Sequence, residues 1–312
     1  MERLKKELLG PYEIRKTYTQ KSAFIDWMSG FAHENGIPMT VEESGKTVCS
    51  RNIILGDVDK ARTIITAHYD TCARMLLPNF STPGCLPLFV LEQTLLTLII
   101  GLGGWLAGHG VYVMASMGMH PLAAGLLSAL AGFAGAMLVL LIMLAGPANP
   151  HTANDNTSGV LTVLLLAKKM KDKPGVAFVL FDNEEKGLFG SQAFIKAHPQ
   201  AARRFLVNLD CVGDGDTLLY TGMKVGMRMP QAKRLLVAME WIAPEYGMRA
   251  VSGEFPKWIY PSDQMLFSRG TAFAALKGKR ILYMDRIHTA KDTVLEERNI
   301  ECLVKVIGES VQ

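Results

Sequence analysis

Histidine and acidic side chains follow four short apolar runs of this sequence, and they are residue types that bind metal ions. They are His68 and Asp70 after 62–67, Asp182, Glu184 and Glu185 after 176–181, Asp210 after 204–209, and Asp285 and His288 after 280–284. Asp155 precedes a further apolar run that begins at Ser158. If these groups meet, they repel one another and lose their ionised forms unless a cation lies among them. Zinc accepts such a mixture of nitrogen and oxygen ligands, so the pattern predicts a metal site.

Each motif alone also has a purely structural interpretation. An Asp before a helix is usually an N-cap, adjacent Glu residues usually belong to a solvated face, and a polar residue after a strand usually satisfies a local turn. The first interpretation applies to Asp155, the second to Glu184 and Glu185, and the third to His68, Asp210 and His288. All five segments lie at the same topological position, in an order that can close one site. This favours the metal site over the separate structural interpretations.

The segments that carry these residues alternate between strand and helix patterns. Apolar, β-branched runs at 51–55, 62–67, 176–181, 204–209, 216–220, 271–276 and 280–284 predict strands. Helical patterns are found at 158–172, 188–198, 229–246 and 296–310. The alternation predicts an α/β fold with a mainly parallel, mixed central sheet flanked by helices. Such sheets bind ligands outside the carboxyl ends of their strands, where the metal site is expected.

A second feature interrupts this pattern. The chain has no Asp, Glu, Lys or Arg from Gln93 to Asn154, and two apolar helices, 92–115 and 121–145, are expected there. Each is long enough to cross a bilayer, which takes about 20 residues. A short turn joins them, so the sequence predicts a transmembrane hairpin, 88–147, inserted between the two parts of the α/β domain, 1–87 and 148–312.

Small residues suggest how the two helices pack. Gly104 and Gly108 form a GxxxG motif, and Ala124, Ser128, Gly132 and Ala136 recur at four-residue steps. Such stripes allow close approach within one hairpin or between hairpins, so a homo-oligomer is an open alternative. A hairpin buried in a soluble core, or an apolar dimerisation arm, is the interpretation without a membrane.

Composition narrows the function classes. The 312 residues carry a net charge of only +4, so the sequence shows no basic region typical of a nucleic-acid-binding protein. Hydrophobic residues make up 49% of the chain. Five separated cysteines without a CxxC motif suit a reducing compartment, and no cleaved secretion signal is expected. Lys and Arg flank the hairpin but are missing from its turn, which favours a cytoplasmic α/β domain. Two spans exclude a polytopic transporter.

Five motifs together closely resemble peptidase family M28. They are AHYDT at 67–71, ANDNTSG at 153–159, DNEEKGLFGS at 182–191, LD at 209–210 and IHTAKDT at 287–293. This family contains co-catalytic zinc aminopeptidases, related carboxypeptidases and glutaminyl cyclases. The resemblance covers the chain from about Arg51 onward, apart from the hairpin, and implies a zinc-aminopeptidase-like fold.

The resemblance also implies a role for each motif. Two zinc ions would be bridged by Asp155, with Glu185 and His288 completing one metal site and His68 and Asp210 the other. Glu184 would be the general base. Asp70 would orient His68.

The chain departs from the family in two places. Many members have Ser-Asp-His where this sequence has PSDQ, with Gln264 in place of the histidine, which bears on the substrate pocket; Tyr260 nearby is a candidate contact for the oxyanion. The other departure is the hairpin, because the connection from Asp70 to Asp155 far exceeds the usual strand-to-helix loop of about 2 to 6 residues.

We therefore expect a membrane-anchored di-zinc aminopeptidase that acts on peptides with a free N-terminus at the lipid bilayer. One alternative is a glutaminyl-cyclase-like acyltransferase with a single zinc, which would not need His68 and Asp210 together. The other is a receptor-like member of the fold without catalysis.

Overall fold

A mixed eight-stranded sheet forms the centre of the molecule in the computed structural model, which describes residues 1–46, 48–75 and 79–311. Its strands are β1 (Met39–Ser44), β2 (Ser50–Leu55), β3 (Thr63–His68), β4 (Val176–Phe181), β5 (Phe205–Leu209), β6 (Thr217–Gly222), β7 (Arg249–Glu254) and β8 (Gly270–Leu276). The order is β1-β2-β4-β3-β5-β8-β6-β7. The central strands β4, β3, β5 and β8 are parallel, whereas β1, β2 and β6 each pair antiparallel with a neighbour. The predicted α/β fold with a mixed central sheet is confirmed.

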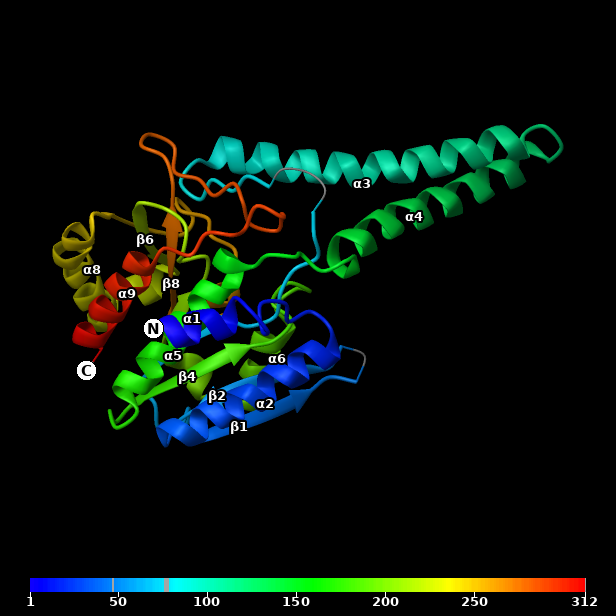
Figure 1. Cartoon of the computed structure of the whole chain (residues 1–312). Coiled ribbons are helices and arrows are strands. Elements are labelled where there is room, and N and C mark those ends of the chain that lie inside the picture. Colours follow the sequence, from blue (N-terminus) through cyan, green and yellow to red (C-terminus); the bar gives the residue numbers. More distant parts are fainter. Residues whose placement is uncertain (47, 76–78, 312) are drawn as a thin grey trace.

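Helices cover both faces of this sheet (Figure 1). They are α1 (Glu2–Leu8), α2 (Tyr18–Asn35), α5 (Gly159–Met170), α6 (Phe189–Ala197), α7 (Lys224–Met227), α8 (Pro230–Ile242) and α9 (Glu297–Ser310). Successive side chains of a strand point to opposite faces, so Ile65 belongs to the core with α2, α5, α8 and α9, and Ile64 to the core with α6. Almost every residue of β2 to β5 is buried, and burial on both faces explains why β4 and β5 are almost continuously apolar.

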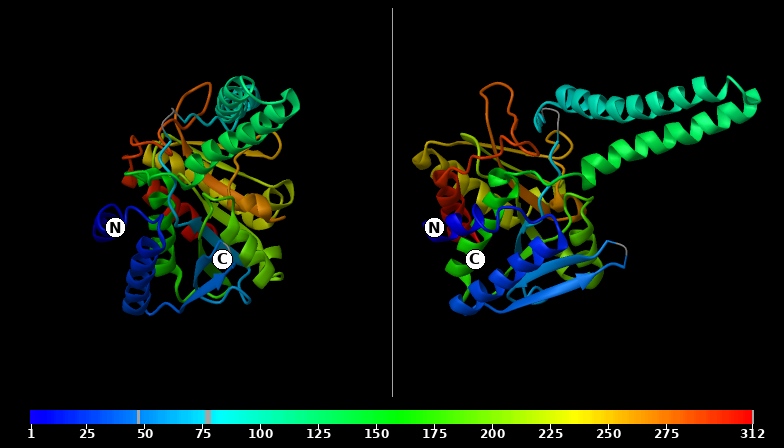
Figure 2. Two further views of the ribbon diagram at one scale, coloured as in Figure 1. Left: turned by 90° about the vertical axis from the view of Figure 1, so that its right-hand side faces the viewer. Right: turned by 45° about the vertical axis from the view of Figure 1, so that its right-hand side comes forward.

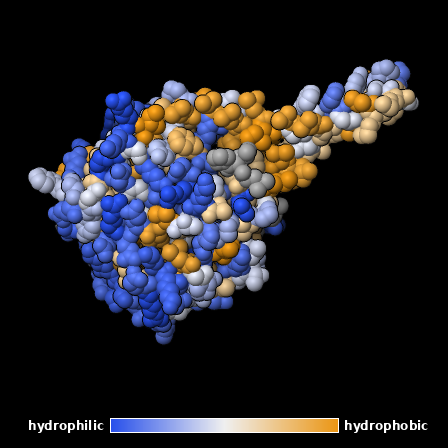
Figure 3. Space-filling view, turned by 45° about the horizontal axis from the view of Figure 1, so that its top comes forward, coloured by the Kyte–Doolittle hydropathy of each residue, from blue (hydrophilic) through white to orange (hydrophobic). Residues whose placement is uncertain are grey.

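The uncharged segment forms a long helical hairpin that projects from this α/β body (Figures 1 and 2). It consists of α3 (Leu86–Ala115) and α4 (Pro121–Ala145), joined by a short turn. Both helices are long and apolar enough to cross a membrane, and the most apolar part of each is exposed. Strongly apolar side chains gather on the part of the hairpin nearest the α/β body, and paler and more polar residues lie toward its tip (Figure 3). Gly104 and Gly108 are buried where the two helices meet.

The base of the hairpin is tied to the α/β body on both sides. Ala73 and Ala148 form an isolated bridge, and the N–H of Arg74 donates to the carbonyl of Pro147. The ammonium group of Lys16 donates to the carbonyl of Leu144, 3.0 Å away. Just before α3, the carbonyl of Pro83 accepts the N–H of Ile259 at 2.9 Å. These contacts hold both ends of the hairpin against the α/β body.

One predicted strand is wrong. Residues 280–284 make only isolated bridges, from Tyr283 to Lys277 and from Met284 to Ser81. The adjacent strand β8 is already paired on both edges, by β5 and β6, so no strand edge is left beside it. The run instead leaves the sheet after Gly278, whose φ of +93° reverses the chain, and reaches the loop before α3.

Candidate metal centre

The predicted ligands gather at one edge of the sheet. His68 is the last residue of β3, Asp210 directly follows β5, and Glu184 and Glu185 lie in the turn after β4. These three strands are parallel, so their carboxyl ends lie together. Asp155 comes from the turn Ala153–Ser158, which leads into α5.

Asp155 lies at the centre of the cluster and faces both histidines. Its Oδ1 lies 3.2 Å from His68 Nε2, and its Oδ2 lies 2.9 Å from His288 Nε2. On the first side Asp210 Oδ1 is 3.6 Å from the same His68 nitrogen. On the second side Glu185 Oε2 is 3.3 Å from the His288 nitrogen. The two oxygens of one carboxylate therefore serve two neighbouring groups of ligands.

These groups fit metal ions by composition and spacing. His68, Asp155 and Asp210 present ligand atoms within 4.8 Å of one another, and so do Asp155, Glu185 and His288. Glu185 Oε1 and Asp210 Oδ1 are buried and accept no hydrogen bond from the residues that the structure describes. A buried carboxylate oxygen without a donor is costly, and a bound cation satisfies it.

Asp70 holds two parts of the site in place. Its backbone carbonyl lies 3.1 Å from His68 Nδ1, whereas its carboxylate is 3.6 Å from that nitrogen. Since a carbonyl can only accept, Nδ1 donates to it, and Nε2 is left facing Asp155 and Asp210. The Asp70 carboxylate accepts the N–H groups of Glu184 and Glu185, at 3.0 and 3.3 Å. The residue therefore orients both the histidine and the turn that carries the predicted base.

Burial and the surplus of carboxylates shift the proton affinities of the cluster. Burial raises the pKa of Glu184 well above its ordinary value and that of Glu185 to about 8. Burial lowers the pKa of His288, but the Glu185 and Asp155 carboxylates outweigh it and raise this pKa to about 10. The pKa of His68 is raised in the same way, chiefly by Glu184. The negative charge that holds these protons equally favours a divalent cation.

Asp155 behaves in the opposite way. Burial would raise its pKa, but the imidazoles of His288 and His68 hold the value below the ordinary one. It is therefore the carboxylate that stays ionised in the centre of the site, as a bridging ligand must.

The other residues named from the sequence take up different positions. Asp182 is buried against the ammonium group of Lys21 and does not join the ligands, and Asp285 pairs with Lys277 at 2.8 Å. Tyr260 lines the cavity at the cluster, and its hydroxyl donates to the backbone carbonyl of Asp210 at 3.0 Å.

Two further residues belong to the site, and the sequence patterns assign neither of them a ligand or orienting role. Asp292 accepts the N–H groups of Asn154 and Asp155, at 2.8 and 3.0 Å, and so fixes the backbone of the central ligand. It lies in the IHTAKDT motif, but the sequence gives no sign of which backbone it faces. Cys72 presents its Sγ to the group of Asp155, Glu185 and His288. Its place two residues after Asp70 was the available signal.

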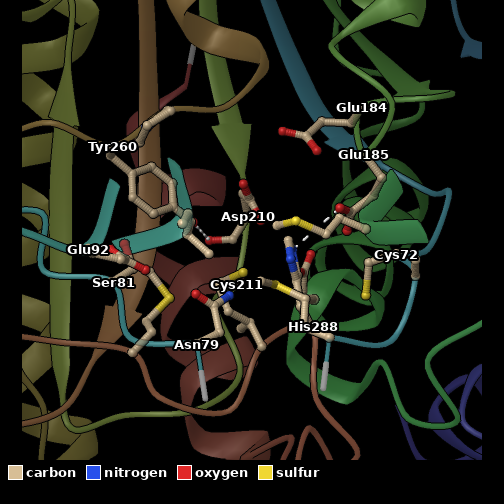
Figure 4. Close-up of a pocket in the computed structure, with 18 of the residues that line it drawn as sticks. Cys72, Asn79, Ser81, Glu92, Glu184, Glu185, Asp210, Cys211, Tyr260 and His288 are labelled. Atoms are coloured by element: carbon tan, nitrogen blue, oxygen red, sulfur yellow. Dashed lines mark hydrogen bonds and ion pairs between the residues drawn. The ribbon is translucent and has the colours of Figure 1, made fainter. Parts of the chain in front are cut away.

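A cavity of about 310 Å³ opens onto the cluster. Figure 4 shows Glu184, Glu185 and His288 on one side of it and Glu92 and Ser81 on the other, with Asp210 between them. Glu92 belongs to α3, so the hairpin contributes directly to the cavity wall. The arrangement offers two clustered ligand groups and, in Glu184, an adjacent carboxylate that can move a proton.

The chain is similar in fold to several solved structures. A glutaminyl cyclase of Porphyromonas gingivalis matches with a TM-score of 0.60 and 16% identity, over 99% of this chain and 94% of its own. A leucine aminopeptidase precursor of Bacteroides thetaiotaomicron matches with a TM-score of 0.55 and 15% identity, over 99% of this chain and 93% of its own. The aminopeptidase LapA of Legionella pneumophila matches with a TM-score of 0.56 and 13% identity, over 98% of this chain and 66% of its own. These similarities show the fold and include both kinds of enzyme.

No curated protein matches the sequence. The model of peptidase family M28 matches residues 141–302, just over half of the chain and the part that holds all the clustered residues except His68, Asp70 and Cys72. The chain therefore belongs to peptidase family M28, most of whose members are zinc hydrolases.

Proposed function

We propose that this chain is a membrane-anchored aminopeptidase with two zinc ions, which removes the N-terminal residue of peptides. The observation that carries the proposal is the position of Asp155. One of its oxygens faces His68 and Asp210, and the other faces Glu185 and His288. Two complete ligand groups that share one carboxylate suit a pair of metal ions.

The residues of the chain then divide the work. Zinc held by these residues would act as a Lewis acid that polarises the scissile carbonyl, and it would lower the pKa of water to about 7. The Glu184 carboxylate takes one proton from the attacking water and passes it to the nitrogen of the breaking C–N bond, so that an amine leaves. Asp70 holds the turn of Glu184 through the two N–H groups that its carboxylate accepts. Tyr260 lies at the cavity wall as a candidate contact for the oxyanion.

The proposal includes a membrane position. The exposed apolar hairpin would lie in the lipid bilayer, and the Lys and Arg residues on both of its flanks favour the cytoplasmic side for the α/β domain. The substrates would then be peptides with a free N-terminus at that surface.

The test is metal analysis and hydrolysis of a panel of aminoacyl amides by the detergent-purified protein, beside Glu184→Gln. We expect about two zinc ions per chain. We expect the variant to keep its metal and to lose at least about 100-fold in kcat, because only the proton transfer is removed.

Other results would change the assignment. Release of ammonia from N-terminal glutamine, with one zinc and no hydrolysis of other amides, would indicate a glutaminyl cyclase. A receptor-like protein would show neither reaction. A chain that binds no zinc would contradict the metal centre itself.

A further inference from the structure

The cavity at the metal centre does not end at the α/β domain. Its wall includes Phe89, Glu92 and Leu96 of α3 and Met143 and Leu144 at the end of α4. A second hollow of about 390 Å³ begins at the same place. Asn79, Glu92 and Leu96 line both, so the two spaces adjoin at the base of the hairpin.

The second hollow is an apolar groove along the first turns of α3. Apart from Asn79 and Glu92 at the junction, its lining is hydrocarbon: Phe80, Leu88, Leu91, Leu95, Leu96 and Ile99. Phe80 is held by a stacked contact with Tyr283, with ring centroids 5.0 Å apart. Leu91 and Leu95 are each about half exposed, at 51%. These side chains line a surface that an apolar ligand could cover.

The length of α3 supports a role beyond anchoring. Its 30 residues span about 45 Å at 1.5 Å each, whereas the hydrocarbon core of a bilayer is about 30 Å thick. The surplus is about ten residues, close to the length of the groove segment 88–99. The beginning of α3 lies over the α/β body in Figure 1, so the residues of α3 that a bilayer does not need cover the metal cavity.

A polar group marks the junction. Glu92 is the only residue among Asp, Glu, Lys and Arg between 86 and 145. Its Oε2 is buried and has no hydrogen-bond partner among the residues that the structure describes. A carboxyl group between a polar cavity and an apolar groove is placed to bond an N–H of a ligand that occupies both.

We infer that the groove is the subsite for an apolar chain on the leaving-amine side of the scissile amide. The inference rests on the proposed function. The residue before the scissile bond occupies the metal cavity, Glu92 accepts an N–H from the leaving portion, and hydrocarbon follows α3 toward the lipid. The substrate class is therefore aminoacyl amides and peptides whose portion after the first residue is long and apolar.

The first test measures hydrolysis of alanyl amides of ethylamine, hexylamine and decylamine by the full chain in detergent. We expect kcat/KM to rise by about two- to fourfold for each methylene that the groove covers. Leu95→Trp fills the groove and should bring the decylamide-to-ethylamide ratio close to one. Leu98→Trp is the matched control, because Leu98 lies on the same helix, is 61% exposed and is not part of the groove lining. It should keep the parent ratio.

If the decylamide-to-ethylamide ratio were the same in the parent chain, Leu95→Trp and Leu98→Trp, the inference would be overturned. Partition of the decylamide into micelles affects all three proteins equally, so it would then explain the preference without the groove. Failure to hydrolyse even the ethylamide would instead contradict the proposed function. A second readout keeps the two apart, because it needs no turnover. The alanyl amide of a decylamine that carries a terminal diazirine is photolysed on the protein with Glu184→Gln in every variant, so that the probe is not hydrolysed, and the label is located by mass spectrometry.

We expect this label on Phe80 and within 88–99, reduced by excess alanyl ethylamide and by Leu95→Trp but not by Leu98→Trp. Label spread over the exposed faces of α3 and α4, unaffected by the ethylamide, would mean simple partition into the apolar phase and would overturn the inference.

Discussion

Single side chains at this centre act through the backbone that holds them. Asp155 presents both oxygens to histidines, and its direction depends on the N–H groups that Asp292 accepts. The metal ligands named from the sequence do lie together, because the carboxyl ends of parallel strands share an edge, whereas Asp182 and Asp285 pair with lysines elsewhere. Asp292 could not be predicted in this way, since its partners are backbone groups far away in the sequence.

Asp292→Asn should weaken zinc binding by about 10- to 100-fold, the usual cost of losing a group that orients a ligand. An amide has one acceptor oxygen for the two N–H groups that the carboxylate accepts, so Asp155 loses its fixed direction. The measurement is competition with a graded chelator, followed by zinc analysis. Asp285→Asn is the control, because Asp285 pairs with Lys277 away from the ligands. Equal zinc affinity in Asp292→Asn and the parent chain would show that Asp292 has no such role.

At the scale of elements, the sequence predicts the buried strands better than the edges. β3, β4 and β5 are short apolar runs buried on both faces, and each was predicted. The edge strands β1 and β7 were missed because they are partly exposed and carry polar residues such as Glu42 and Ser252. Pairing, rather than composition, makes them strands. The strand predicted at 280–284 is wrong for the opposite reason. This run has the composition of a strand, but no unpaired strand edge lies beside it, so it cannot extend the sheet.

The edge strand β1 is fastened by an ionisable contact. His198, after α6, lies 2.8 Å from Glu42 of β1 and 3.3 Å from Asp59. Burial lowers the pKa of His198, but Glu42 and then Asp59 raise it above the ordinary 6.5. Protonated His198 therefore stabilises the fold fully below about pH 6.5, and this contribution is lost as the pH rises through the higher folded pKa.

His198→Gln should consequently lower the melting temperature by about 2 °C more at pH 6 than at pH 9, because its loss of the ring contact with Phe194 is the same at both pH values. Thermal unfolding of both proteins in the same detergent at the two pH values measures this. A difference that stays constant between pH 6 and pH 9 would mean that the contact does not depend on charge.

The hairpin has a packing contact that can be tested separately. A Cβ on Gly108 would lie 2.9 Å from the carbonyl oxygen of Ser128, whose hydroxyl donates to the carbonyl of Gly108. Gly108→Leu should therefore force α3 and α4 apart and destabilise the hairpin by about 1–3 kcal/mol. Gly110→Leu is the control, because nothing lies within 4 Å of a Cβ there. Thermal unfolding in detergent compares them, and equal losses would contradict this packing.

At the scale of the whole molecule, charge and hydropathy divide the chain into two regions. The α/β domain carries essentially all Lys and Arg residues, and the hairpin carries none. The sequence therefore predicts that an apolar insertion is present, and the structure contains it. What the sequence could not show is that the insertion also forms a wall of the cavity, because that depends on how α3 lies over the sheet.

The proposed orientation predicts which side each part faces. Met117, in the turn of the hairpin, is 83% exposed, and Lys233 is an exposed residue of α8. In intact bacteria that produce the protein, a membrane-impermeant maleimide should label Met117→Cys above the level of the parent chain. Lys233→Cys should react only after lysis. The reverse pattern would place the α/β domain outside, and labelling of neither variant before lysis would contradict the hairpin as a span.

The order of the strands in the sheet has a consequence for biosynthesis. β3 ends before the hairpin begins, and both of its neighbours, β4 and β5, are translated after it. A nascent chain that has completed β3 has no partner for this strand, and it holds His68 without Asp155 or Asp210. Both hairpin helices, α3 and α4, must therefore leave the ribosome before the centre of the sheet can close. In the membrane position proposed above, the metal ligands would therefore come together only in a chain whose anchor has already been synthesised.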